Sequence, residues 1–209
     1  AELIRMMNDF LTPMTTKIMD FRGTVDKYMG DAIMAFWNAP LDDPDHALHA
    51  CQAALAMRAV LAPLNESLKA RAEMQSRIFH PLKIGVGIGT GNCSVGNMGS
   101  RQRFAYSALG DTVNLSSRLE GQTKAYGVQS LISNKTQATV KGMAFLEVDM
   151  LAVKGRTEPE RIFTLMGDEV LAQSSGFIDL KEKHETMIAA YRSRAFDKAI
   201  ESAVQCAGL

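Results

Sequence analysis

Glycine recurs at every second position of one short segment, at Gly85, Gly87, Gly89 and Gly91. The positions between these glycines carry β-branched residues, and this alternation predicts a strand over residues 82–90. One face of such a strand has no side chains, so another element must pack very close to its backbone. The chain therefore has to fold around at least one strand that lies directly beneath a neighbouring element.

The same glycines fit neither of two common nucleotide-binding motifs. No G-x-G-x-x-G register is present, and the glycines lie inside a strand rather than at the start of a helix. Residues 91–96 have the spacing of a phosphate-binding loop, but Asn97 stands where that loop requires lysine. The four histidines also lack the spacing of a catalytic triad or a metal site.

Hydrophobic periodicity predicts helices and strands that interleave along the chain, with hairpins among the strands. The expected helices are residues 3–21, 46–68, 111 to about 127, and a short one from Ser133. The expected strands are residues 24–29, 32–37, 82–90, 103–109, 128–132, 145–153 and 161–165. The segment Asp42-Asp43-Pro44-Asp45 is expected to supply an acidic N-cap, with proline at the first helical position. This mixture favours an α+β fold over a doubly wound parallel sheet.

Length and charge restrict the function. A chain of 209 residues suggests one domain with a small appendage. Equal numbers of basic and acidic residues, 23 each, give no overall attraction to nucleic acid or to an anionic membrane. No apolar run approaches the ~20 residues that span a bilayer, and the three widely spaced cysteines are typical of reduced thiols, so we expect a cytoplasmic domain.

The composition changes near Gly167. Residues 173–176 have the composition of a linker, and residues 181–207 are expected to be helical. The apolar positions of that helical segment resemble part of a tetratricopeptide repeat, although a simple amphipathic helix explains them equally well. We therefore expect a main domain over residues 1–166, and a linker with a helical extension over residues 167–209.

Three groups of side chains could carry chemistry. Lys27 and Asp31 bracket an expected hairpin turn at Gly30-Asp31, where Asp31 could reach a divalent cation. Asn114 and Arg118 are four residues apart on one expected helix and project from the same face, where an amide and a guanidinium suit anionic oxygens. Lys154 and a nearby arginine place two cations on a turn. Each group alone is more often ordinary surface or turn structure.

In combination and in this order, these segments resemble the class III adenylyl/guanylyl cyclase catalytic domain. The resemblance extends from residue 1 to about residue 166 and is carried by TVDKYMGDA at 24–32, YSALGDTVNLSSRLEG at 106–121 and VKG at 153–155. It implies a ferredoxin-like α+β core, in which helices flank a mixed or antiparallel sheet. It also implies a head-to-tail homodimer with active sites shared across the interface.

The resemblance implies roles for three residues near the reacting phosphate. Asp31 matches one of the two aspartates that bind metal, with two Mg²⁺ or Mn²⁺ ions expected per site. Asn114 matches the residue that orients the ribose, and Arg118 matches the residue that stabilises charge on the transferring phosphate. The family's other metal aspartate precedes the first helix, so we expect the strand that carries it to be absent from this chain. The motif of that other metal aspartate does not include Asp9, Asp20 or Asp26.

The resemblance also implies how the nucleotide is bound. Lys154 matches the lysine that holds the terminal phosphates, and Lys27 and Ser107 match the two positions that read the purine. Lysine can donate to N1 of adenine, and a serine hydroxyl can accept from the 6-amino group, whereas guanine presents the opposite pattern. Serine at position 107 is similar to the small hydroxyl residue of bacterial-type members.

The implied activity is that of an adenylate cyclase, which converts ATP to cyclic AMP and pyrophosphate. A non-catalytic cyclase-like module that binds nucleotide or a partner is the alternative, favoured by the absent aspartate. A guanylate cyclase is disfavoured by Lys27. The resemblance further leads us to expect an upstream sensor or membrane domain in the full-length protein.

Overall fold

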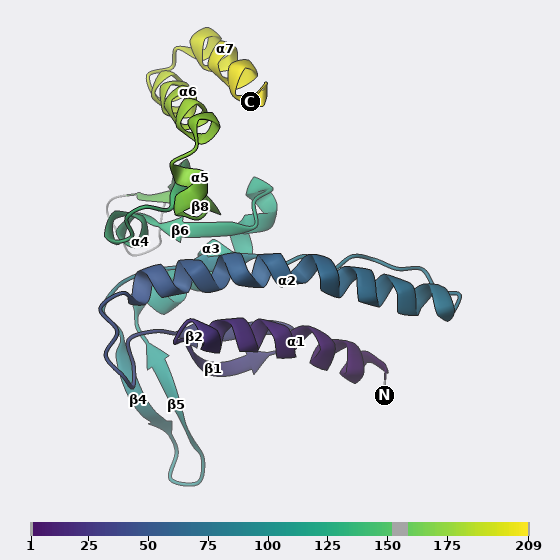
Figure 1. Ribbon diagram of the computed structural model, residues 1–209. Coiled ribbons are helices and arrows are strands. Elements are labelled where there is room, and N and C mark those ends of the chain that lie inside the picture. The colour runs from purple at the N-terminus through teal and green to yellow at the C-terminus, as the bar shows by residue number, and fades with distance from the viewer. Residues whose placement is uncertain (1, 152–158, 209) are drawn as a thin grey trace.

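A mixed four-stranded sheet forms the centre of the computed structural model, which describes residues 2–151 and 159–208 (Figure 1). The strands lie in the order β3–β6–β8–β7, with β3 parallel to β6 and the other neighbours antiparallel. Their bounds are Val86–Ile88 for β3, Ser130–Ser133 for β6, Ala144–Leu151 for β7 and Glu160–Gly167 for β8. The α+β class expected from the sequence is confirmed.

Two antiparallel hairpins accompany this sheet, and within the described residues neither is joined to it by a strand ladder. One hairpin pairs β1 (Thr24–Met29) with β2 (Ala32–Phe36) around Gly30, whose φ of +66° suits glycine. The other pairs β4 (Ser94–Gly99) with β5 (Phe104–Leu109) and projects away from the sheet in Figure 1. Strand β4 was not predicted, because its glycines and polar residues lack a strand pattern.

Two helices cover opposite faces of the four-stranded sheet. Helix α2 (His46–Met74) packs its alanine-rich face on Ile132 and Phe163, whereas α3 (Asp111–Tyr126) packs on Leu131 and Ile162. Since successive residues of a strand point to opposite faces, these adjacent pairs separate the two helices. Helix α1 (Glu2–Asp20) lies alongside α2 and away from the sheet (Figure 1).

Helix α2 is long and apolar enough, by length and composition, to cross a membrane, and it is alone in this among the helices of residues 2–151 and 159–208. Its buried residues, Ala47, Ala50, Cys51, Ala53, Ala54, Leu61 and Leu68, lie in the protein core. A core helix passes the same test of length and composition.

The chain ends in three helices, α5 (Glu169–Ala172), α6 (Ser175–Arg192) and α7 (Phe196–Ala207), which follow the short helix α4 (Asn134–Thr139) and the last two strands. The single helical segment expected over residues 181–207 is therefore two helices, and the expected linker at 173–176 already contains the start of α6. Phe177 of α6 packs on Ala144 and Leu146, and Glu147 of β7 is ion-paired with Arg192. These contacts attach α6 to the sheet.

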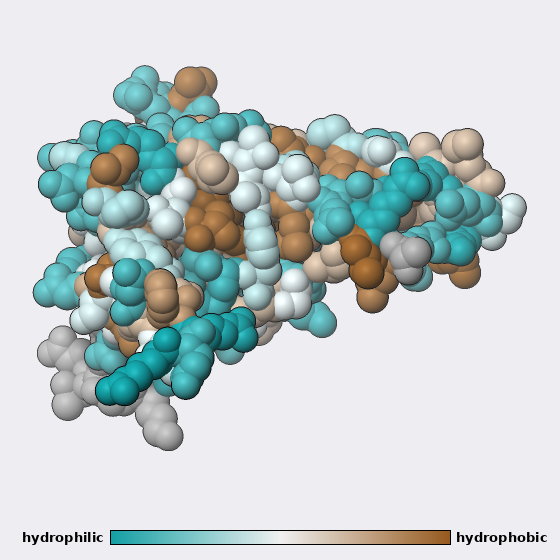
Figure 2. Space-filling model, turned by 90° about the horizontal axis from the view of Figure 1, so that it is seen from below, coloured by the Kyte–Doolittle hydropathy of each residue, from teal (hydrophilic) through white to brown (hydrophobic). Residues whose placement is uncertain are grey.

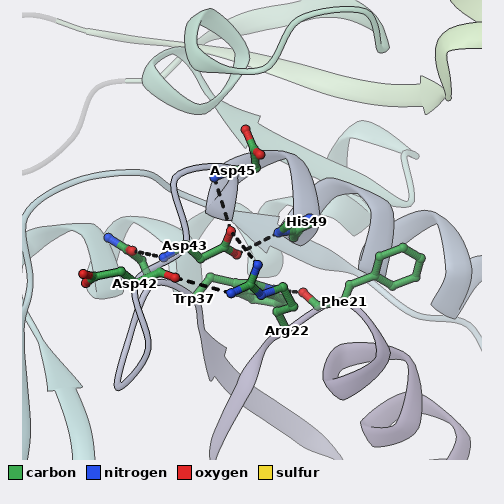
Figure 3. A network of polar contacts seen from close by, with 8 residues as sticks. Phe21, Arg22, Trp37, Asp42, Asp43, Asp45 and His49 are labelled. Atoms are coloured by element: carbon green, nitrogen blue, oxygen red, sulfur yellow. Dashed lines mark hydrogen bonds and ion pairs between the residues drawn. The ribbon is translucent and has the colours of Figure 1, made fainter.

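A buried carboxylate joins the start of α2 to the end of α1 (Figure 3). The side chain of Asp43 is 3% exposed and lies 2.7 Å from Nδ1 of His49. Its Oδ1 atom accepts from the backbone N–H of Asp45 at 3.3 Å and lies 3.9 Å from the guanidinium of Arg22. Burial by itself raises the pKa of Asp43, but the hydrogen bond and charge of His49, with the charge of Arg22 and the Asp45 N–H, outweigh it and lower that pKa.

This arrangement corrects the expected N-cap of α2. Asp45 occupies the cap position but makes no side-chain cap hydrogen bond, and Pro44 precedes it rather than starting the helix. The buried carboxylate of Asp43 contacts the first turn of the helix instead, through Nδ1 of His49.

We expect Asp43→Asn to lower the free energy of unfolding by about 1–3 kcal/mol at pH 7, because it weakens a buried hydrogen-bonded network. The folded-state pKa of Asp43 is depressed, so its contribution is present above its unfolded pKa, near pH 4, and is lost as the pH falls through the folded-state value. Denaturant unfolding of wild type and variant at pH 7 and pH 3 measures this difference, which should shrink at pH 3. Exposed Asp42→Asn is the matched control, and a difference that stays constant with pH contradicts the assignment.

Candidate functional site

Lys27 and Ser107, the two residues predicted to read the base, lie on different hairpins, and their side chains are in contact. Lys27 lies on β1 and Ser107 on β5, 80 residues later, and the ammonium of Lys27 donates to Oγ of Ser107 at 3.2 Å. Ser107 is buried, whereas the side chain of Lys27 is 47% exposed. Lys27 therefore holds an exposed ammonium beside a buried hydroxyl, and the role of the pair in binding a base stays a prediction.

A third residue, Asp26, completes this cluster. Its side chain is 0% exposed, and its Oδ2 atom accepts from the hydroxyl of Ser107 at 2.5 Å and from the backbone N–H of Ala108 at 3.3 Å. Its Oδ1 atom lies 3.3 Å from the ammonium of Lys27. Asp26 thus joins β1 to β5 by its side chain.

A β-bulge explains why two consecutive residues, Asp26 and Lys27, both face Ser107. In a regular strand, successive side chains point to opposite faces. The register of β1 against β2 shifts between Val25 and Lys27, so that Asp26 has no partner in the ladder. An extra residue of this kind turns the strand locally. The family resemblance gave Asp26 no role as a metal ligand, and the sequence gave no sign of this contact, since only the fold brings β5 beside β1.

Helix α3 presents the predicted phosphate-binding face. Asn114 and Arg118 are exposed, while Leu115 and Leu119 on the other side are buried against the sheet. Neither the side-chain amide of Asn114 nor the guanidinium of Arg118 has a hydrogen bond or ion pair with any other residue that the structure describes. Their donors are therefore free to bind an anionic oxygen.

The alternating glycines hold α3 in place. Val86 and Ile88 face α2, so Gly87 faces α3. A Cβ atom at Gly87 would lie 2.0 Å from the backbone oxygen of Ser116 and 2.4 Å from the backbone nitrogen of Glu120. The expected close approach of another element is confirmed, although the laddered part of the strand is limited to Val86–Ile88.

Asp31, the predicted metal ligand, is exposed at the turn of the β1–β2 hairpin. Within residues 2–151 and 159–208, no group of three or more histidine, cysteine, aspartate or glutamate side chains is arranged to hold a metal ion. The carboxylate of Asp26 is buried and already bound to Ser107. Of Asp26 and Asp31, only Asp31 has an exposed carboxylate, and one carboxylate does not form a two-metal site. Lys154 lies outside the described residues.

Comparisons with known proteins agree on one family. The family described as "Adenylate and Guanylate cyclase catalytic domain" matches residues 1–167. Adenylate cyclase 1 of Rhizobium meliloti is 35% identical over 169 residues, which are 79% of this chain and 24% of that protein. An adenylate cyclase of Anabaena cylindrica is 34% identical over 170 residues, 78% of this chain and 32% of that protein. The chain thus spans about a quarter to a third of these curated relatives.

Solved structures show the same similarity. The adenylyl cyclase CyaB from P. aeruginosa has a TM-score of 0.71 and 33% identity, over 80% of this chain and 84% of that chain. The guanylyl cyclase Cya2 has a TM-score of 0.68 and 29% identity, over 80% of this chain and 81% of that chain.

We expect Gly87→Ala to destabilise the protein by about 1–3 kcal/mol, since a methyl group there overlaps the backbone of α3. The displaced helix should also weaken any anion binding at Arg118. Gly121→Ala on α3 is the matched control, because a Cβ there meets nothing within 4 Å and alanine favours the helix. Denaturant unfolding measures both variants, and equal stability of the two contradicts the close-packing argument.

Proposed function

The chain belongs to the adenylate and guanylate cyclase catalytic-domain family, and on that premise we propose that it is the catalytic domain of an adenylate cyclase. It would form 3′,5′-cyclic AMP and pyrophosphate from ATP. The observation that carries this proposal is the contact between Lys27 and Ser107, which gathers a donor and an acceptor at one point. Adenine offers the complementary pair, its N1 acceptor and its 6-amino donor.

The reaction joins the ribose 3′-oxygen to the α-phosphorus as the bond to the pyrophosphate oxygen breaks and the hydroxyl proton is lost. Arg118 would donate to the phosphate oxygens, because a planar guanidinium with free donors stabilises charge on a transferring phosphate. Asn114, one helical turn earlier, would hold the ribose. Lys154 would bind the terminal phosphates.

We propose Mg²⁺ or Mn²⁺ as the cofactor, with Asp31 as one ligand. The exposure of Asp31 at a hairpin turn leaves its carboxylate accessible to a cation. Two cations need a second aspartate, which the resemblance places on a strand that precedes the first helix.

A homodimer would combine the two halves of each site, with Asp31 from one protomer and Lys27, Ser107, Asn114, Arg118 and Lys154 from the other. Figure 2 shows apolar side chains on the face that carries α1 and the hairpins. The exposed apolar residues of these elements include Leu3, Ile4, Tyr28, Met29, Phe104 and Tyr106. An apolar face of this kind favours burial against a second protein surface.

Residues 167–209 would form an extension outside this catalytic domain, since the family match ends at residue 167. We place the domain in the cytoplasm, where ATP is available, with a sensor or membrane segment elsewhere in the full-length protein. The second candidate function is a non-catalytic nucleotide-binding module, favoured because no group of three or more metal-binding side chains is found among the described residues.

The 209-residue chain should form little cyclic AMP, whereas a chain extended to include the preceding strand should form it readily. One carboxylate cannot hold two cations roughly 3.5–4 Å apart. The measurement is cyclic AMP and cyclic GMP formed from ATP and GTP with Mg²⁺ or Mn²⁺. Strong turnover by the shorter chain would show that its metal site is complete. An extended chain that binds ATP but forms no cyclic nucleotide would favour the non-catalytic module.

Mixing two inactive variants tests the composite site. In the extended chain, Asp31→Ala and Arg118→Ala should each nearly abolish activity, and their mixture should recover roughly a quarter of it, because half the dimers are mixed and each has one intact site of two. Cyclic AMP formation is measured while one variant is titrated into the other at fixed total protein. A mixture of Arg118→Ala with Asn114→Ala is the control and should stay inactive, since both changes lie in the same half. A flat titration despite mixed dimers would contradict the shared site.

A further inference from the structure

A serine hydroxyl does not by itself distinguish adenine from guanine. It has one proton to donate and two lone pairs that accept, so it can pair with the amino group of adenine or with the carbonyl oxygen of guanine. Ser107 could therefore bind either base if its proton were free to rotate.

Asp26 fixes the direction in which the hydroxyl proton of Ser107 points. A carboxylate can only accept, so the short 2.5 Å contact between Oγ of Ser107 and Oδ2 of Asp26 requires that Ser107 donate its proton there. The side chain of Asp26 is 0% exposed, and water cannot replace Ser107 as its partner. The N–H of Ala108 also donates to Oδ2, which holds the carboxylate in place.

Lys27 and Ser107 each keep a hydrogen-bonding group that is not used within the cluster. One lone pair of Ser107 accepts from Lys27 at 3.2 Å, and the other is left to accept. Lys27 uses one of its three donors on Ser107, lies 3.3 Å from Asp26 Oδ1, and has an exposed side chain with a donor to spare. The cluster thus offers one acceptor and one donor, which match the amino group and N1 of adenine. Guanine presents O6 and N1–H at these positions, so both contacts would be mismatched.

We propose that Asp26 is a positioning residue that sets the base specificity of this site by fixing the proton of Ser107 and the ammonium of Lys27. This inference rests on the proposed function, in which Lys27 and Ser107 receive the adenine of ATP. Asp26 itself is buried and acts through the other two residues.

The main test is Asp26→Asn, which keeps the shape of the side chain. Asparagine can donate as well as accept, so Ser107 regains the choice of donating to the base, and Lys27 loses its counter-charge. The 209-residue chain is titrated with ATP and with GTP in competition with a fluorescent ATP analogue. We expect the ratio of ATP affinity to GTP affinity to fall by about tenfold or more, since one mismatched buried hydrogen bond changes binding by that order.

Further variants separate positioning from folding. Asp26→Glu retains an acceptor-only group and should keep the preference for ATP, and Asp26→Ala replaces Asp26→Asn if that variant does not fold. In a Ser107→Ala background, Asp26→Asn should have little further effect on the ratio, because residues that act through one another are not additive. Asp149→Asn is the matched control, since Asp149 also accepts from a hydroxyl, that of Tyr126, outside the site.

The binding measurements distinguish a failure of the inference about Asp26 from a failure of the proposed function. If wild type prefers ATP and Asp26→Asn keeps that preference, or weakens both nucleotides equally, the inference is wrong and the proposed function stands. If wild type binds ATP and GTP equally, or neither, the assignment of ATP fails and the inference fails with it. A loss of preference that appears in Asp26→Asn, is absent in Asp149→Asn and disappears in the Ser107→Ala background supports the inference.

Discussion

The contact between α3 and the bare face of β3 is the constraint on which the rest of the site depends. Two backbones approach so closely at Gly87 that no side chain fits between them. This approach brings Leu115 and Leu119 onto the sheet and, by the helical repeat, directs Asn114 and Arg118 outward. The outward position of Asn114 and Arg118, which we propose to face the phosphate, is thus a consequence of the glycines beneath the helix.

The cluster of Asp26, Lys27 and Ser107, which we propose to read the base, is built in a different way. Its residues lie on two hairpins that share no ladder within the described residues, and side chains make the connection. Asp26 hydrogen-bonds across to β5, and the bulge in β1 is what lets it do so beside Lys27. A buried ion is costly unless it is paired and hydrogen-bonded. Here Lys27 is the ion-pair partner of Asp26 and Ser107 hydrogen-bonds to Oδ2, whereas Oδ1 has no hydrogen-bond partner among the described residues.

Local patterns predicted much of this structure from the sequence. The periodicity of residues 3–21 and the Gly30-Asp31 turn correspond to α1 and to the β1–β2 hairpin. The glycine alternation correctly required a closely packed neighbour, although only the structure identifies it as α3. Lys27 and Ser107 were paired through a family resemblance, and their contact is observed.

The remaining features depend on tertiary contacts. Asp26 and Asp43 lie in segments that the sequence analysis singled out, but those patterns do not predict their partners. The partners are known only once β5 and the first turn of α2 are in position. Strand β4 exists because β5 supplies its ladder, not because its own residues favour a strand.

The separation of the two hairpins from the central sheet has a mechanical consequence. The hydrogen bond between Asp26 and Ser107 crosses a boundary where, within the described residues, no backbone ladder shares the load. A displacement of the β4–β5 hairpin relative to β1 would therefore break this side-chain contact before it disturbed either hairpin. A force on the projecting hairpin would therefore change the alignment of Lys27 and Ser107, and, on the proposed function, it would alter how a base is recognised far from the loop that bears the force.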